Sequence, residues 1–193
     1  MVQCRLGDIA SVQTGYSFRS AVEYDKAGSV RVIQMRDLGD DHTVQVDRLG
    51  CVDMDASPSQ QVFVGDVILR SRGDVATSAI VSTDPGRAVV AAPLLRIRVS
   101  DPRVAAEYLN WFINQPPAQA YLSKNAEGSN VKMITKRTLE ELEVELPPLE
   151  RQREIVELWG LADRERKLER HLEERRSQFL SEVMMRHAQG GTR

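Results

Sequence analysis

The sequence is poor in the residues that build metal centres, disulfide frameworks and membrane spans. Its 193 residues include two cysteines, Cys4 and Cys51, and three histidines. Neither cysteine has metal-ligand spacing around it, so two free thiols in a reducing cytoplasm and no metal site are expected. The N-terminal residues lack the basic-then-apolar order of a signal peptide, and no apolar run approaches the about 20 residues that a bilayer requires. A cytoplasmic protein without a membrane partner is therefore expected.

Catalytic motifs are missing as well. The sequence has no glycine-rich dinucleotide loop, no Walker loop and no methyl-transfer motif of the Asp/Asn-Pro-Pro-aromatic type. It also lacks a Ser-His-Asp set and a carboxylate cluster with a lysine that would be typical of a nuclease. His42 falls in an acidic loop, whereas His171 and His187 fall in a long charged helix. These absences argue against an enzyme with a cofactor of its own, and they leave binding as the expected class.

Strong net charge is a third absence. The 26 lysines and arginines nearly cancel the 28 aspartates and glutamates, which leaves a formal net charge of −2 at pH 7. Overall basicity therefore does not indicate a nucleic-acid partner, and any surface for DNA must be local. The length allows one domain of about 140 residues and one extension, but not two full domains.

The sequence does contain one long charged helix, predicted for residues 147–188. Pro147 and Pro148 suit the lead-in to a helix, and the stretch after them holds one glycine, Gly160, and no proline. Steps of three and four give a heptad seam in which five of seven positions are apolar. The seam positions are Leu158, Leu161, Glu165, Leu168, Leu172, Arg175 and Phe179.

The length of this helix predicts that it has a partner. At about 1.5 Å per residue it spans roughly 57 Å, which is more than a domain of this size needs to close its core. We therefore predict a coiled-coil homodimer with the seam as its interface. The alternative is a surface helix packed along its own domain, whose charges are only its solvated face.

The residues before the proline pair predict one globular domain of the α+β class. Apolar alternation predicts strands within residues 30–38, 44–46, 62–69, 79–82 and 87–99. Helical spacing predicts helices within residues 6–12, 104–114 and 118–122. The predicted organisation is a mixed α/β domain over residues 1–146, the long coiled-coil helix over 147–188 and a flexible tail over 189–193.

Polar and basic side chains near the strands are candidates for DNA contact. Gln34 and Arg36 fall on one face of the strand predicted for residues 30–38, and in a major groove Gln pairs with adenine and Arg with guanine. The same residue types also occupy ordinary sheet faces, which is the alternative. Arg96 and Arg98 alternate with apolar residues, a pattern typical of a solvated sheet face.

A loop over residues 123–137 offers phosphate contacts. Its small central residues stand between lysines, so backbone amides and ammonium groups can reach phosphates together. The alternative is a mobile basic loop without a ligand. Tyr16 either touches a ligand or packs in the core with Phe18. The candidate set for DNA contact is Tyr16, Arg19, Gln34, Arg36, Arg70, Ser71, Arg72, Lys124, Ser129, Asn130, Lys132 and Lys136.

Short motifs along nearly the whole chain resemble the specificity subunit of type I restriction-modification systems. They are LGDIA at 6–10, GYSFR at 15–19, VIQMRDL at 32–38, GDVILRSRG at 65–73, APL at 92–94, LNW at 109–111 and LPPLERQ at 146–152. The last motif, followed by a coiled-coil helix, is the most specific. In full-length members of that family two recognition domains and two helices are related by a pseudo-twofold, and this chain resembles a half-length form with one of each.

The resemblance implies a non-catalytic subunit that reads one half of a split double-stranded DNA site. Its helix would act as a ruler and as a docking surface for adenine-N6 methyltransferase subunits, which would bind S-adenosylmethionine, with a restriction/translocase subunit as a further partner. An antiparallel homodimer would rebuild the full arrangement and read a gapped palindrome, with Glu165 facing Arg175 across the twofold. The alternative is a coiled-coil adaptor whose globular domain no longer reads DNA.

Overall fold

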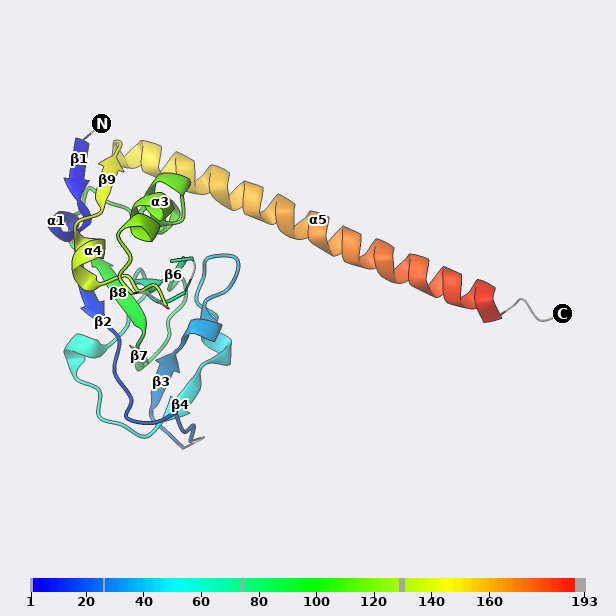
Figure 1. The fold of residues 1–193 in the computed structure, drawn as a ribbon, viewed down its shortest axis with the longest axis horizontal. Helices are drawn as coiled ribbons and strands as arrows, with labels where there is room; N and C mark the ends of the chain where they lie inside the picture. The colour runs from blue at the N-terminus through cyan, green and yellow to red at the C-terminus, as the bar shows by residue number, and fades with distance from the viewer. Residues whose placement is uncertain (1, 26, 74, 129–130, 190–193) are drawn as a thin grey trace. The chain divides into compact units, whose positions relative to one another are not determined.

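Nine β-strands in three sheets and five α-helices form the part of the chain that the computed structural model describes (Figure 1). The described residues are 2–25, 27–73, 75–128 and 131–189. The chain divides into two compact units, Met1–Val156 and Glu157–Arg193. The predicted fold class, a mixed α/β domain followed by a long C-terminal helix, is confirmed.

The central sheet is antiparallel and lies in the middle of the first unit. Its strands, in spatial order, are β2 (Ala10–Thr14), β8 (Leu94–Val99), β5 (Val67–Arg70) and β6 (Ser78–Ile80). Val67 pairs with Ile80 on one side and with Ile97 on the other. Residues 94–97 of β8 are all buried, because both faces of this sheet are covered.

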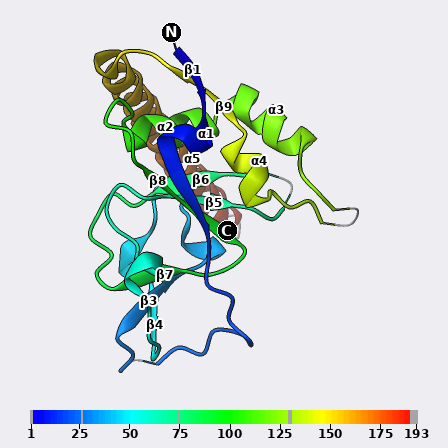
Figure 2. The ribbon, with the colours of Figure 1, turned by 90° about the vertical axis from the view of Figure 1, so that its left-hand side faces the viewer.

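A three-stranded sheet covers one face of the central sheet, and helices cover the other. In the smaller sheet, β3 (Val30–Ile33) lies between β4 (Gly50–Val52), which is antiparallel to it, and β7 (Ala88–Val90), which is parallel. Figure 2 shows this sheet at one end of the unit and the helices at the other. One core cluster joins Ile33 and Val90 to Ile68, and a second joins Leu69 to the helices.

Four short helices and one long helix complete the fold. They are α1 (Leu6–Ile9), α2 (Ala106–Ile113), α3 (Pro116–Lys124), α4 (Lys136–Glu140) and α5 (Leu149–Gln189). β1 (Val2–Arg5) pairs antiparallel with β9 (Glu143–Leu146), which brings the start of the domain beside its end. The first turns of α5 belong to the first unit, where Ile155 and Val156 pack against the core. Residues 190–193 of the predicted tail lie outside the described residues.

Three local predictions are wrong. Residues 10–12 belong to β2 and not to a helix, because the helix ends at Ile9. Residues 62–64 form no strand, since the Asp66 carboxylate accepts a bond from the Phe63 amide (2.9 Å) and closes a turn there. Residues 44–46 form no strand. Thr43 and Val44 make only isolated bridges, and a 3₁₀ helix begins at Val46.

Tyr108 on α2 should make the domain sensitive to alkali. Its hydroxyl donates to the carbonyl of Glu145 (2.6 Å), and burial, with a smaller effect of the Glu145 charge, raises the pKa of Tyr108 to about 12 from 10.0. Below about pH 10 both states keep this proton, but as the pH rises further only the unfolded chain releases it. The free energy of unfolding should therefore fall between about pH 10 and 12, and Tyr108→Phe should reduce that fall by about 2 kcal/mol in guanidinium titrations.

Candidate nucleic-acid interface

Two segments far apart in the sequence pair at one exposed edge of the domain. The amide of Ile134 donates to the carbonyl of Ser71 (2.7 Å), and the amide of Gly73 donates to the carbonyl of Lys132 (3.3 Å). Arg72 forms an isolated bridge with Met133 between these two bonds. The pairing places Arg72 and Lys132, both exposed, on neighbouring backbones, and we call residues 71–73 and 132–134 the paired edge.

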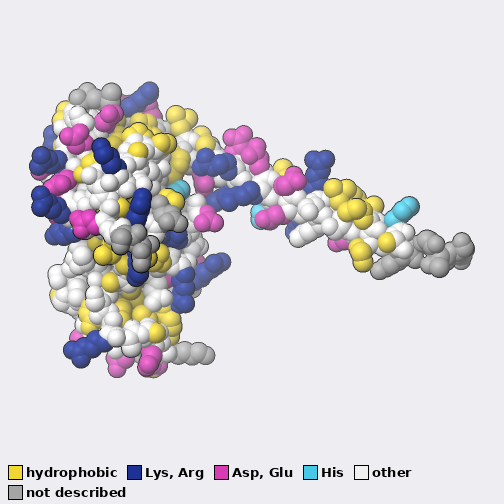
Figure 3. All heavy atoms as spheres, in the orientation of Figure 1, with side chains coloured by type: hydrophobic (Ala, Val, Ile, Leu, Met, Phe, Trp, Pro, Cys, Tyr) yellow, Lys and Arg dark blue, Asp and Glu magenta, His cyan; other side chains and the backbone are white. Residues whose placement is uncertain are grey.

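The paired edge is apolar as well as basic. Val75, Val131 and Met133 beside the two basic residues are each between 44% and 58% exposed. A cavity of about 390 Å³ lies next to it, between Gly73 and Lys132 on one side and α3 on the other. Figure 3 shows basic and hydrophobic side chains next to one another on the face of the domain turned to the viewer. Such a mixed surface suits DNA, whose phosphates attract cations and whose sugars and base edges accept apolar contact.

The neighbouring candidates Arg70, Ser71 and Arg72 divide between the interior and the surface. Arg70 is half-buried and donates from Nη2 to the carbonyls of Met35 (2.9 Å) and Leu38 (3.0 Å). Ser71 is buried, and its hydroxyl donates to the carbonyl of Pro93. Of these three side chains, Arg72 is the exposed one. Arg70 and Ser71 support, from inside, the backbone that carries Arg72.

Gln34 and Arg36 do not share a strand face, contrary to the prediction. β3 ends at Ile33, and Met35–Asp37 is a 3₁₀ helix because the buried Asp37 carboxylate accepts a bond from the Gln34 amide (2.8 Å). Arg36 is exposed and lies over the ring of Tyr24, with its guanidinium carbon 5.1 Å from the ring centroid. Arg36 also donates to the Tyr24 hydroxyl, so this arginine is held in one orientation at the surface.

Tyr16 and Arg19 lie on an exposed segment after β2. The Tyr16 amide donates to the carbonyl of Val90 (2.6 Å), and its ring meets the edge of Phe18 with centroids 4.8 Å apart. Tyr16 is exposed, whereas Phe18 is half-buried and packs against the smaller sheet. Phe18 therefore belongs partly to the core, and Tyr16 and Arg19 offer their side chains to solvent.

The remaining candidates lie around α3 and α4. Lys124 is in the last turn of α3 and is exposed, while Lys136 begins α4 and forms an ion pair with Glu140 (3.5 Å). Ser129 and Asn130, the centre of the predicted phosphate loop, lie outside the described residues. The structure thus brings together Arg72 and Lys132 through backbone pairing, and it gives Tyr16, Arg19 and Arg36 as separate exposed side chains.

Arg96 and Arg98 are not on a solvated face, contrary to the prediction. Arg98 forms a two-pronged ion pair with the buried Asp66 (2.6 and 2.7 Å), and this hydrogen bonding raises the pKa of Arg98. Arg96 is buried and donates to the carbonyl of Gln61 and to the side-chain oxygen of Gln13, both at 2.6 Å. Burial lowers the pKa of Arg96, which has no carboxylate contact of this kind. Through these bonds to Gln61 and Asp66, both arginines hold the loop before β5 against the central sheet.

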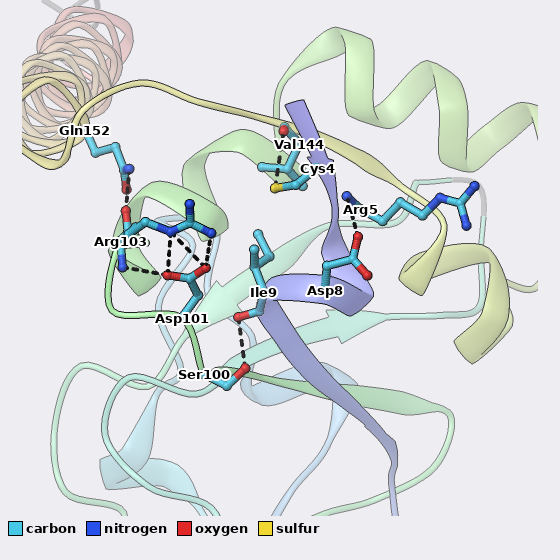
Figure 4. A network of polar contacts seen from close by, with 9 residues as sticks. All are labelled: Cys4, Arg5, Asp8, Ile9, Ser100, Asp101, Arg103, Val144 and Gln152. Atoms are coloured by element: carbon cyan, nitrogen blue, oxygen red, sulfur yellow. Dashed lines mark hydrogen bonds and ion pairs between the residues drawn. The ribbon is translucent and has the colours of Figure 1, made fainter. Parts of the chain in front are cut away.

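Gln152 is the residue whose role sequence reasoning missed. It is fully buried at the start of α5, where its Oε1 accepts from the Ala105 amide (2.9 Å) and its Nε2 donates to the carbonyls of Arg103 (2.8 Å) and Pro147 (2.9 Å). Figure 4 shows Gln152 above the loop that carries Arg103 and Asp101. Hydrogen bonding from Arg103 holds the pKa of Asp101 at about 2 and fixes that loop. The glutamine of the LPPLERQ motif therefore anchors the long helix to the domain.

Comparison with known proteins identifies the class of this fold. The family model of the type I restriction modification DNA specificity domain matches residues 1–174. The HsdS subunit from Thermoanaerobacter tengcongensis aligns with a TM-score of 0.61 and 23% identity, over 85% of this chain and 37% of that chain. A structure from work on complex assembly and conformational transition of the type I R-M system aligns with a TM-score of 0.64 and 21% identity, over 97% and 43%. The S subunit from M. genitalium aligns with a TM-score of 0.56 and 11% identity, over 84% and 39%.

The matched range covers the globular domain and the first 26 of the 41 residues of the long helix, so the class is that of DNA specificity domains. The chain belongs to the type I restriction modification DNA specificity domain family. Because this is a family of specificity domains and not of catalytic subunits, the prediction that the chain is not an enzyme is confirmed. The chain spans 37% to 43% of the length of the solved chains that it matches. A comparison with curated proteins finds no match.

Among the described residues, no helix is both long enough and apolar enough to cross a bilayer. The His, Cys, Asp and Glu side chains of these residues nowhere gather in a group of three that could hold a metal ion.

Proposed function

We propose that this chain reads one half of a two-part DNA site and pairs with a second copy through α5 to read the other half. The family match over residues 1–174 supports both parts, since it covers the domain together with the first 26 residues of α5. The observation that carries DNA contact is the paired edge, where Arg72 and Lys132 are exposed side by side. Arg36, Arg19 and Tyr16 are further contacts, whereas Arg70 and Ser71 support the edge from inside.

The proposal for α5 rests on its unpartnered apolar seam. Leu158, Leu161, Leu168, Leu172 and Phe179 are each between 50% and 71% exposed in the single chain. Five large apolar side chains in heptad spacing are costly to leave in water, and a second copy of the same helix would cover them. Antiparallel pairing makes the contact self-complementary and relates two domains by a twofold axis.

The partners proposed beyond DNA are those of the family. An adenine-N6 methyltransferase subunit carrying S-adenosylmethionine would dock on the paired helices, and a restriction/translocase subunit would join the same complex. One of the matched structures comes from work on complex assembly of a type I R-M system, which supports this proposal by similarity of fold. A duplex library with random sequence, bound by the purified chain together with its methyltransferase and then sequenced, should enrich a gapped palindrome. Recovery of unenriched sequence would overturn the proposal and favour the adaptor alternative.

Alanine substitutions at the paired edge should weaken DNA binding and its salt dependence. If Arg72 and Lys132 each neutralise a phosphate, Arg72→Ala and Lys132→Ala should each reduce the slope of log K against log salt by about 0.9. Fluorescence anisotropy with a labelled duplex at several salt concentrations measures this slope. A loss of DNA affinity that is equal for all duplex sequences would indicate a phosphate contact. Relaxed specificity at one base pair of the site would indicate a base contact.

Arg48→Ala is the matched control for the paired edge. Arg48 is an exposed arginine of the same domain, in the 3₁₀ helix Val46–Arg48, and it lies outside the candidate set. Its substitution should leave the slope unchanged. If Arg48→Ala lowered the slope as much as Arg72→Ala, the domain would bind DNA only through its scattered cations, and the paired edge would have no special part.

A further inference from the structure

Arg36 is an exposed arginine whose side chain is held by a tyrosine ring. Its guanidinium carbon lies 5.1 Å from the centroid of the Tyr24 ring, and its Nη2 donates to the Tyr24 hydroxyl (2.5 Å). The Arg36 side chain is nevertheless 62% exposed, so it remains open to a ligand. An arginine at the surface ordinarily adopts many rotamers, and two contacts with one ring reduce the orientations that this guanidinium can take.

The Tyr24 ring in turn packs against a glycine. Gly50 begins β4, and a Cβ atom built on it would lie 2.1 Å from two carbons of the Tyr24 ring. The ring therefore occupies the space that the side chain of any other residue at position 50 would need. The amide of the next residue, Asp25, donates to the carbonyl of Cys51 (2.9 Å), which ties this segment to β4. The ring contact and the backbone bond together fix where the Tyr24 hydroxyl lies.

The turn that carries Arg36 is fixed to the strand that leads to the paired edge. Arg36 lies in the 3₁₀ helix that follows β3. On either side of it, the carbonyls of Met35 and Leu38 accept from Nη2 of Arg70 (2.9 and 3.0 Å). Arg70 is the last residue of β5, and Arg72 follows two residues later. The side chain of Arg70 therefore holds the turn of Arg36 close to the start of the paired edge.

The Arg36 guanidinium keeps two parallel donors for a ligand. A guanidinium has five N–H groups, and the Tyr24 hydroxyl accepts from one of the two on Nη2. Whichever of these two the hydroxyl uses, the other stands beside an N–H of Nε or Nη1 and forms a two-pronged edge with it. Asp37 Oδ1 lies 3.8 Å from Nε, which is beyond hydrogen-bond distance.

Two parallel donors match guanine and not adenine. In the major groove guanine presents two acceptors, N7 and O6, whereas adenine presents the acceptor N7 and a donor on N6. A guanidinium only donates, so adenine would place a donor against a donor. Phosphate also accepts two-pronged bonds, but it can be approached from many directions, whereas a base edge requires donors held close to one orientation. The contact with Tyr24 supplies that orientation, and it favours a base over a phosphate.

We propose that Arg36 reads a guanine in each half of the DNA site through the major groove, and that Tyr24, packed against Gly50, is the positioning residue that holds its guanidinium. This inference rests on the proposed function and adds to it the identity of one base and the side chain that recognises it. In this arrangement the paired edge contacts the backbone of the duplex, and Arg70 fixes the base contact relative to the backbone contact.

Arg36→Lys and Tyr24→Phe test the two roles separately. The selection from random duplexes, repeated with each variant, measures the preference for each base at each position of the site. Arg36→Lys keeps the charge but loses the two-pronged edge, so the preference for guanine at one position of each half-site should fall by about 10- to 100-fold. The slope of log K against log salt should stay unchanged. Tyr24→Phe keeps the ring but loses the hydroxyl, so the preference at the same position should fall by about 2- to 10-fold.

Arg48→Lys and Tyr121→Phe are the matched controls. Arg48 is exposed in the 3₁₀ helix Val46–Arg48, and Tyr121 is half-buried on α3. The two substitutions make the same chemical changes away from the pair of Arg36 and Tyr24. Neither should change the base preference at any position of the site.

The outcomes separate this inference from the proposed function. If Arg36→Lys still enriches the two-part site with unchanged base preferences, Arg36 is not a base reader, and the proposed function stands. An affinity loss that is equal for all duplexes would make Arg36 a phosphate contact and would equally overturn the inference. A lost preference in Arg36→Lys with none in Tyr24→Phe would overturn the positioning role of Tyr24. A wild-type chain that enriches no site would overturn the proposed function, and this inference with it.

Discussion

Replacing Gln152 with leucine should lower the free energy of unfolding of the domain by about 2–4 kcal/mol. Leucine has a similar volume, so little cavity forms, but the three hydrogen bonds to Ala105, Arg103 and Pro147 are lost. Each backbone group left buried without a partner costs about 1–3 kcal/mol, and the fully buried site admits little water to replace the amide. Guanidinium denaturation followed by circular dichroism, at one fixed protein concentration, measures the loss.

Arg151→Gln is the matched control for Gln152. Arg151 is the preceding residue on α5, but its side chain is exposed and pairs with Glu154 on the same helix (2.7 Å). An exposed pair of this kind contributes about 0.3–0.5 kcal/mol, so its loss should be small beside that of Gln152. If both substitutions cost the same, the three hydrogen bonds would not be what holds the start of α5 on the domain.

Gln152 also shows which features of the fold could be predicted from the sequence and which could not. The proline pair, the heptad seam and the charged composition predicted the long helix and its start to within a few residues, because these are local signals. The motif LPPLERQ was recognised by resemblance, but its glutamine had no predicted role. The partners of that side chain, the backbone groups of Arg103 and Ala105, lie 49 and 47 residues away in the sequence. No local pattern indicates such a contact.

The errors at the candidate interface have the same physical origin. Arg70 and Arg72 alternate on one strand end, yet Arg70 turns inward because the carbonyls of Met35 and Leu38, from another loop, accept its protons. Arg98 looked solvated because its partner Asp66 lies 32 residues earlier. By contrast, the turn at Gln34 was readable, since an aspartate three residues later is a local capping signal that ends the strand.

Changing Leu168 and Leu172 together to glutamate should convert a dimer of 21.7 kDa chains into monomers. In the antiparallel register the two residues face each other on both sides of the twofold axis, so four carboxylates would replace four leucines in adjacent layers. Burying these side chains stabilises the dimer by about 1.5–3 kcal/mol each, and the like charges would add repulsion. Light scattering coupled to size exclusion measures the molar mass. Arg170→Ala with Glu174→Ala, on the opposite side of the helix, should leave the dimer intact.

Exchange of the two seam charges tests the direction of pairing. In an antiparallel pair centred near position 170, Glu165 of one copy faces Arg175 of the other, whereas in a parallel pair each residue would face its own like charge. Glu165→Leu and Arg175→Leu should therefore each weaken the antiparallel dimer, because each substitution, present in both copies, leaves two unpaired charges in the seam. The double substitution should lower the free energy of dimerisation by less than the sum of the two single losses, with a coupling energy of about 0.5–3 kcal/mol. Two single substitutions that each tighten the dimer would instead indicate relief of like-charge repulsion, and the helices would run parallel.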